Sequence, residues 1–167
     1  MRVFSYVAHE DDSRNLLRAV SLKLFEKGIV KESYIDAVVK REEKFPTGLQ
    51  GERGINVAIP HADVQHVNKE ALVIIRPAKG KHLLFKRMDE PSQTIPINLV
   101  LLLVVMTNEG YVKFLSELVS LINDEEFVSY VKQDAEKEII STIVNKVVKH
   151  HFILEDEVTN LTDDYSS

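Results

Sequence analysis

The fold of this chain is organised around the stretch Gly54-Ile55-Asn56-Val57-Ala58-Ile59-Pro60-His61-Ala62-Asp63. The apolar and β-branched residues from Ile55 to Ile59 favour a pleated, half-buried strand. Pro60 cannot donate a ladder hydrogen bond and fixes its own φ, so the strand has to end or bend there. We therefore expect His61 just past the carboxyl end of a strand, where functional groups collect in open α/β sheets.

The remaining apolar patterns predict helices before and after a group of strands. Leu16, Leu17, Val20, Leu24 and Phe25 recur at helical spacing and predict a first helix that Asp12 or Ser13 caps and Gly28 ends. Further helices are expected at 31–44, 108–122, 125–131 and 135–148, and Asn123 or Asp124 is expected to cap the helix at 125–131. Strands are expected at 71–75, 83–85 and 97–105. Residues 1–12 fit a strand or a loose lead. This order predicts a single-domain α/β sandwich with a mixed central β-sheet flanked by helices, whose most apolar strand, 97–105, is covered on both faces.

Composition narrows the possible functions. The chain has 167 residues, a net charge of −5 and no cysteine. The negative charge and the lack of a basic stripe argue against nucleic-acid binding, and the lack of cysteine excludes disulfides and thiolate chemistry within the chain. No signal peptide is visible at the start, and the apolar run 97–106 is too short to cross a bilayer. We expect a cytoplasmic protein without direct membrane insertion.

Several kinds of site find no support in the sequence. His61 and His66 are five residues apart, His150 and His151 are adjacent, and there is no H-E-x-x-H, so neither a metal nor a cofactor is expected. No G-x-S-x-G elbow is present. The glycine-bearing loop 45–54 has no nucleotide-binding spacing. It fits either a plain turn or a nest of backbone N–H groups beside an anion.

The remaining candidates are His61 and Arg41. A neutral imidazole is nucleophilic near pH 7, and the N–P bond that it forms is labile enough to pass a phosphoryl group on. Arginine offers a planar fork for phosphoryl oxygens. Without further information, His61 also fits a structural or surface histidine, and Arg41 fits a solvated helix end within Lys40-Arg41-Glu42-Glu43-Lys44.

A longer pattern links these residues. Arg41-Glu42-x-x-x-x-Thr47-Gly48-Leu49, followed by Gly54-Ile55-x-Val57-Ala58-Ile59-Pro60-His61, resembles the type 2 (fructose/mannitol) enzyme IIA domain of the bacterial sugar phosphotransferase system (PTS). The resemblance runs from about residue 16 to residue 148 and is nearest to the galactitol-specific members. It implies a three-layer sandwich over residues 1–154. The acidic and polar composition of residues 155–167 predicts a loose C-terminal tail or a late edge element.

The resemblance also implies a function, that of a phosphotransferase component in sugar transport. His61 would accept a phosphoryl group from phospho-HPr as a tele-phosphohistidine and donate it to a cysteine of the IIB component, which phosphorylates the sugar that enters through IIC. Arg41 would stabilise phosphoryl charge, and Thr47 would hydrogen-bond near the site, with Gly48 in support. The sugar would be galactitol-like. Alternatives are a regulatory phosphocarrier of the same fold and a non-catalytic interaction module.

One position departs from the family pattern. Many relatives carry a second histidine at the start of the helix after the central strand, and counting back from Leu115-Ser116-Glu117-Leu118 places Tyr111 there. Tyrosine can donate a hydrogen bond to a phosphoryl oxygen but cannot carry a positive charge. We expect Tyr111 to substitute for that histidine, with His66 as the alternative helper.

Overall fold

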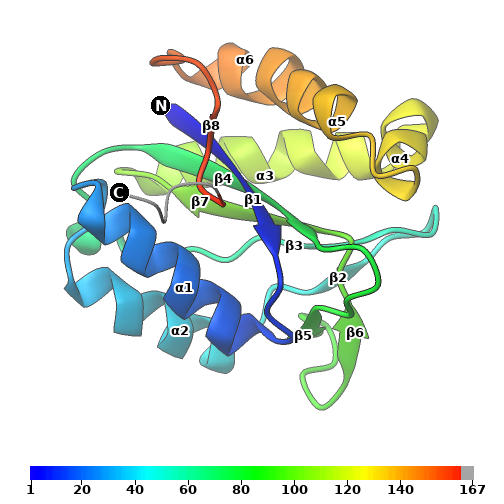
Figure 1. Ribbon diagram of the computed structural model, residues 1–167, viewed down its shortest axis with the longest axis horizontal. Coiled ribbons are helices and arrows are strands. Elements are labelled where there is room, and N and C mark those ends of the chain that lie inside the picture. The colour runs from blue at the N-terminus through cyan, green and yellow to red at the C-terminus, as the bar shows by residue number, and fades with distance from the viewer. Residues whose placement is uncertain (163–167) are drawn as a thin grey trace.

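A mixed sheet forms the middle layer of the computed structural model, which describes residues 1–162 (Figure 1). Its six strands are β1 (Arg2–Ala8), β2 (Leu49–Gln50), β3 (Asn56–Ala58), β4 (Ala71–Pro77), β7 (Leu99–Val104) and β8 (Thr159–Asn160). They lie in the order β2-β3-β7-β4-β1-β8. The pairs β2–β3 and β4–β7 are antiparallel, and the other pairs are parallel. The predicted mixed sheet is confirmed, and the lead over residues 1–12 contains a strand.

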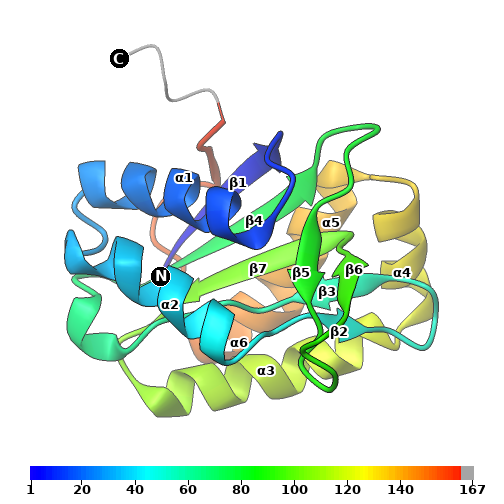
Figure 2. The same cartoon turned by 90° about the horizontal axis from the view of Figure 1, so that it is seen from below.

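Helices cover both faces of this sheet. Figures 1 and 2 show α1 (Ser13–Glu26) and α2 (Ser33–Lys44) together on one face. The other face packs against helices from the second half of the chain, which are α3 (Asn108–Ile122), α4 (Glu125–Lys132), α5 (Glu136–Ile143), the π-helical turn Val144–Val148 and α6 (Lys149–His151). The protein is therefore the three-layer α/β sandwich that the sequence predicted.

Strand β7 is the centre of the core. All six of its residues are buried, because each face of the strand meets a different helix layer. Val100, Leu102 and Val104 pack with α1 and α2, whereas Leu99, Leu101 and Leu103 share a core cluster with α3, α4, α5 and the π-helical turn. Such a two-sided strand reads as a continuous apolar run, which is why the sequence identified it.

Local capping chemistry sets the helix starts. The Asp12 carboxylate accepts a hydrogen bond from the Asn15 N–H, and the Asp124 carboxylate accepts one from the Phe127 N–H. Aspartate is therefore the cap at both positions where the sequence left two choices. Of the residues at helical spacing in α1, Phe25 is 37% exposed, because Ser21 and Leu24 complete the buried face of the helix.

The sequence missed two short strands. One is β2, which pairs with β3 inside the stretch 45–54 that was expected to be a loop. The other is β6. Strands β5 (Leu84–Lys86) and β6 (Thr94–Pro96) pair as a separate two-stranded sheet, and only the first was expected. Figure 2 shows this hairpin beside β2 and β3. Alternating exposure in both short strands gives a weak apolar signal, which explains why β6 was not predicted.

The C-terminal segment adds an edge to the sheet. Thr159 and Asn160 pair in parallel with Phe4 and Ser5, and Leu161 is fully buried. Of the two interpretations of this segment, the late edge element applies to β8. Residues 163–167 of the predicted tail lie outside the described residues, and the boundary at residue 154 stays a prediction.

Candidate functional site

Three elements bring Arg41, His61 and Tyr111 to one place. Arg41 lies in the last turn of α2, His61 follows β3, and Tyr111 lies in the first turn of α3. The Pro60 carbonyl still accepts a hydrogen bond from the Leu103 N–H at 3.2 Å. The chain therefore leaves the sheet beside β7 only after Pro60, and this fixes His61 at the sheet's end.

The His61 ring is covered on one face by Tyr111. The two ring centroids are 3.9 Å apart, with 27° between the ring planes, which is a stacked arrangement. The His61 Nδ1 atom is enclosed and has no hydrogen-bond partner. The ring is thus held from the side of Tyr111, and its Nδ1 atom is shielded from solvent.

Burial keeps the His61 imidazole neutral. It lowers the pKa of His61 from its usual 6.5 to about 4, and the nearby Arg41 charge acts in the same direction. The backbone of Ile59 and the Asp63 carboxylate oppose this lowering with smaller effects. At neutral pH the ring therefore has a free electron pair, which a nucleophile needs.

Arg41 supplies the positive charge of the site. One terminal guanidinium nitrogen lies 3.3 Å from the Asp63 carboxylate, and the Phe45 ring lies 5.6 Å from the guanidinium carbon. The Asp63 side chain is 69% exposed, so this ion pair is weak and readily exchanged for another anion. Arg41 Nε is buried and makes no hydrogen bond.

Unpartnered buried polar atoms are concentrated here. Within residues 1–162, four such side-chain atoms occur, and two of them are Arg41 Nε and His61 Nδ1. A buried donor without a partner costs about 1–3 kcal/mol, so such atoms call for an explanation. A neutral nucleophile beside an underused guanidinium can accept an anionic, electrophilic group such as a phosphoryl group.

Thr47 lies behind the His61 site, in the loop after α2. Its hydroxyl donates to the Glu42 carboxylate at 2.8 Å and lies 3.1 Å from the Ile59 N–H. Its backbone N–H donates to the second Glu42 oxygen at 2.8 Å. The hydroxyl proton is therefore already used, and Thr47 fixes the loop against β3.

Gly48 has a packing role. A Cβ atom at Gly48 would lie 2.5 Å from the Lys86 carbonyl oxygen, so only glycine lets the β5–β6 hairpin approach. The Gly48 N–H donates to Lys86 O, and the Gly51 N–H donates to Ile55 O. Because these groups are paired within the protein, the loop is a turn and does not form a free nest for an anion.

His66 is not brought to His61. Its Nδ1 atom lies 2.8 Å from the Ser33 hydroxyl, at the first residue of α2. Arg41 is eight residues further along the same helix, which corresponds to roughly 12 Å. His66 therefore contacts the N-terminal end of α2, away from Arg41. Of Tyr111 and His66, the two candidates to replace the second histidine of the family, Tyr111 is the one that contacts His61.

Other candidate features lie elsewhere. No group of three or more potential metal ligands occurs in the described part of the chain. His151 contacts the Glu117 carboxylate at 3.2 Å, at the C-terminal end of the helical segment. Among the helices of residues 1–162, none combines the length and apolar character needed to cross a bilayer.

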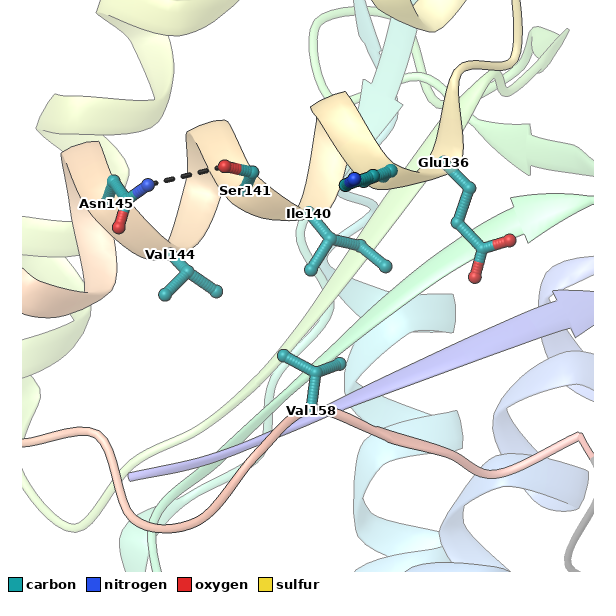
Figure 3. A pocket seen from close by; sticks show the side chains of 7 residues that line it. Glu136, Ile140, Ser141, Val144, Asn145 and Val158 are labelled. Atoms are coloured by element: carbon teal, nitrogen blue, oxygen red, sulfur yellow. Dashed lines mark hydrogen bonds between the residues drawn. The ribbon is translucent and has the colours of Figure 1, made fainter.

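An apolar hollow of about 530 Å³ lies between α5 and the C-terminal segment. Figure 3 shows Ile140 and Val144 pointing toward Val158 across it, with Asn145 and Ser141 hydrogen-bonded to each other on the helix. None of its lining residues belongs to the His61 site. Its lining contains neither a histidine nor an arginine, so it is not a second candidate for the same chemistry.

Three further residues belong to the site, and the sequence alone indicates no role for them. Glu42 is part of the pattern that begins with Arg41, Phe45 begins the glycine-bearing loop, and Asp63 ends the stretch that contains His61. Glu42 immediately follows Arg41, so on a helix it points to a different side. A glutamate on the buried side of an otherwise apolar helix face was the signal available in the sequence.

Comparisons with known proteins identify the family and the fold. Residues 3–147 match the protein family described as "Phosphoenolpyruvate-dependent sugar phosphotransferase system, EIIA 2". Over 117 residues the chain is 27% identical to the PTS system galactitol-specific EIIA component of Escherichia coli strain K12, covering 70% of this chain and 75% of that protein.

Solved structures share the fold. The crystal structure of IIA mannitol from Escherichia coli has a TM-score of 0.59 at 20% identity, covering 87% of this chain and 94% of that one. A complex of enzyme IIA(Mtl) with phosphorylated enzyme IIB(Mtl) from Escherichia coli has a TM-score of 0.60 at 18% identity, covering 88% and 94%. At these identities the likeness concerns the fold.

Proposed function

This chain belongs to the EIIA type 2 family of the phosphoenolpyruvate-dependent sugar phosphotransferase system. We propose that it is a phosphocarrier and that His61 is the residue that carries the phosphoryl group. The observation that carries the proposal is the neutral, Tyr111-stacked His61 ring beside Arg41. Phosphoryl transfer requires mainly positioning and charge stabilisation, and these two groups provide both.

The transfer step follows from the chemistry of the ring. The electron pair of His61 Nε2 attacks phosphorus as the bond from phosphorus to the donor's histidine nitrogen breaks, and the donor leaves as a neutral imidazole. Because Nδ1 is enclosed in the protein, Nε2 is the favoured nucleophile, which gives a tele-phosphohistidine. Arg41 exchanges Asp63 for phosphoryl oxygens, and its Nε gains a partner. In the second step an acceptor thiolate attacks phosphorus, the bond from phosphorus to His61 Nε2 breaks, and His61 leaves as a neutral imidazole.

Tyr111 takes the place of a second histidine in this scheme. Burial raises the pKa of the Tyr111 hydroxyl above its usual value, so the hydroxyl stays protonated and remains a hydrogen-bond donor near neutral pH. It offers one donor to a phosphoryl oxygen and adds no charge. Arg41 is then the main source of positive charge at the site.

The proposed partners are phospho-HPr as donor and a IIB component as acceptor, with a IIC permease acting through IIB. The complex of IIA(Mtl) with phosphorylated IIB(Mtl), which shares this fold, supports a IIB partner. The surface beside His61 suits transient docking, because the side chains of Phe45 and Val112 are 56% and 63% exposed next to Arg41 and Tyr111. Similarity to the galactitol-specific EIIA component supports a sugar alcohol of the galactitol type.

Phosphorylation by purified components tests this function. The protein is incubated with phosphoenolpyruvate, enzyme I and HPr, and intact mass is measured at neutral or basic pH because phosphohistidine is acid-labile. We expect one added phosphoryl group in the native protein and none in His61→Gln. No added mass, with a working control carrier in the same mixture, would overturn the proposal.

The acceptor and the sugar need a second experiment. The phosphorylated protein is mixed with IIB components of galactitol, mannitol and fructose systems, and loss of its phosphoryl group is followed over time. We expect the fastest transfer to the galactitol-type IIB. Equal rates for all three would remove the galactitol assignment and leave the carrier function in place.

A further inference from the structure

Glu42 is an unusual residue for the buried side of α2. Its side chain is only 5% exposed, and within residues 1–162 it forms no ion pair. Both of its carboxylate oxygens instead accept hydrogen bonds from Thr47, one from the backbone N–H and one from the hydroxyl. A buried carboxylate without a cation is costly, and such groups persist where they serve a purpose.

The direction of these hydrogen bonds can be worked out. The Thr47 hydroxyl has one proton, which it donates in a hydrogen bond to the Glu42 carboxylate. The Thr47 hydroxyl oxygen must therefore be the acceptor in its contact with the Ile59 N–H, whose nitrogen lies 3.1 Å away. A continuous chain of donors runs from Ile59 through Thr47 to Glu42.

The position of Ile59 links this series of hydrogen bonds to His61. Strand β3 ends at Ala58, and Pro60 has no N–H, so Ile59 carries the last backbone donor before His61. His61 follows Ile59 by two residues, and the intervening Pro60 has a fixed φ and a carbonyl that accepts a hydrogen bond from the Leu103 N–H. A shift of Ile59 would therefore move the ring relative to both Arg41 and Tyr111.

We propose that Glu42 is a positioning residue for His61, acting through the Thr47 hydroxyl to fix the Ile59 peptide and thereby the orientation of the imidazole. This inference rests on the proposed phosphocarrier function and adds to it a residue that touches neither the phosphoryl group nor its donor. Glu42 and Arg41 are neighbours on α2, so one helix end supplies both the charge for the phosphoryl group and the anchor for its acceptor.

The ionised form of Glu42 is the one that fits this geometry. The ionised carboxylate accepts two hydrogen bonds from Thr47. If Glu42 were protonated, its O–H group would point at one of these two Thr47 donors and that hydrogen bond would be lost. Burial raises the pKa of Glu42 to about 7, and the two Thr47 hydrogen bonds counteract this rise. Glu42 also helps to raise the pKa of Tyr111, so its charge reaches the third residue of the site.

The test uses Glu42→Gln and Thr47→Val, which keep side-chain size, and measures kcat and KM for phospho-HPr. Glutamine offers only one acceptor, and valine removes the hydroxyl. We expect kcat to fall about 10–100-fold in each variant and little further in the double variant, with KM within twofold. Thr47→Ser restores the hydroxyl and should recover most of the loss.

A matched control separates positioning from general stability. Asp124→Ala removes a helix cap on α4 and lowers the free energy of unfolding at a site without contact to His61. We expect its kcat to stay within twofold of native. A kcat in Glu42→Gln that is also within twofold of native, at a comparable loss of stability, would overturn the proposal.

A second readout works without any phosphorylation. The ¹⁵N shifts of the His61 ring and the exchange rate of the Ile59 amide are measured in the unphosphorylated variants. We expect both to change in Glu42→Gln and Thr47→Val and neither to change in Asp124→Ala. Unchanged His61 and Ile59 signals would overturn the positioning role, whereas a native protein that takes no phosphoryl group would overturn the proposed function.

Discussion

The β4–β7 pair lies in the middle of the sheet and the His61 site lies at its end, and the two regions differ in whether their buried polar atoms have hydrogen-bond partners. In β4–β7, all six residues of β7 and the facing residues of β4 are apolar and buried, and their backbone groups pair in a regular ladder. At the His61 site, Arg41 Nε and His61 Nδ1 are buried without partners, and Glu42 is a buried acid with a pKa of about 7.

This difference separates stability from function. Burial of apolar surface in β4–β7 stabilises the fold, at roughly 25 cal/mol per Å². Unsatisfied polar groups at the site lower stability, and they leave donors and an electron pair available for an incoming group. Substitutions in the pair should therefore change unfolding, and substitutions at the site should change transfer.

The largest effect on transfer is expected from Arg41→Gln. Loss of a charged donor to the transferring group should slow phosphorylation of His61 by about 10²–10³-fold, whereas the free energy of unfolding should change by less than about 0.5 kcal/mol. The rate is measured with phospho-HPr as donor. Arg14→Gln is the control, since Arg14 forms a comparable exposed ion pair with Glu43 at 2.8 Å. An equal loss in both variants would point to net charge and not to the site.

Leu101→Ala tests the other side of the comparison. Leu101 is fully buried in β7, so its truncation should lower the free energy of unfolding by about 3 kcal/mol. The phosphorylation rate per folded molecule should stay the same. Denaturant unfolding and the transfer assay measure the two quantities, with the 48% exposed Leu22→Ala as control. A slowed transfer in folded Leu101→Ala would show that the two regions are coupled.

The pH dependence of stability distinguishes the two titrating groups of the site. Glu42 has a raised pKa, so its contribution to stability is full below pH 4.5 and is lost as pH rises through about 7. His61 has a lowered pKa, so its contribution is full above pH 6.5 and is lost as pH falls toward 4. Between these limits the two contributions offset each other.

Single variants should reveal how each group makes the free energy of unfolding depend on pH. In His61→Gln the free energy of unfolding should fall with rising pH, by roughly 3 kcal/mol at most, because only Glu42 remains. In Glu42→Gln it should rise with pH over the His61 window. Denaturant unfolding at several pH values between 4 and 8 measures both. Parallel curves for the native protein and both variants would contradict the opposed titrations.

The smallest effect is expected from Tyr111→Phe. The phenyl ring keeps the stacking on His61 and loses one hydroxyl donor, so transfer should slow by about tenfold or less. Tyr111→Ala removes the stacked ring as well and should lose more. Single-turnover phosphorylation rates compare the two. A normal rate in Tyr111→Phe would restrict Tyr111 to holding the ring in place.

Much of this protein could be predicted from its sequence because local chemistry decided it. The two-sided apolar run gave β7, aspartate caps gave the starts of α1 and α4, and Pro60 fixed the end of β3 just before His61. Periodicity did not identify β2 and β6, because strands of two or three residues give too short an apolar signal. Phe25 fits the helical spacing but is exposed, because Ser21 and Leu24 complete the buried face of α1.

The composition of the site was decided by tertiary structure. The sequence alone determined a strand-ending histidine, an arginine near a helix end and the pattern that joins them. Only the folded chain shows that Tyr111 stacks on His61, that His66 is held by Ser33, and that Glu42 reaches Ile59 through Thr47. The physical reason is that sequence patterns record which face of an element is buried, whereas contacts between faces of different elements depend on how the layers pack.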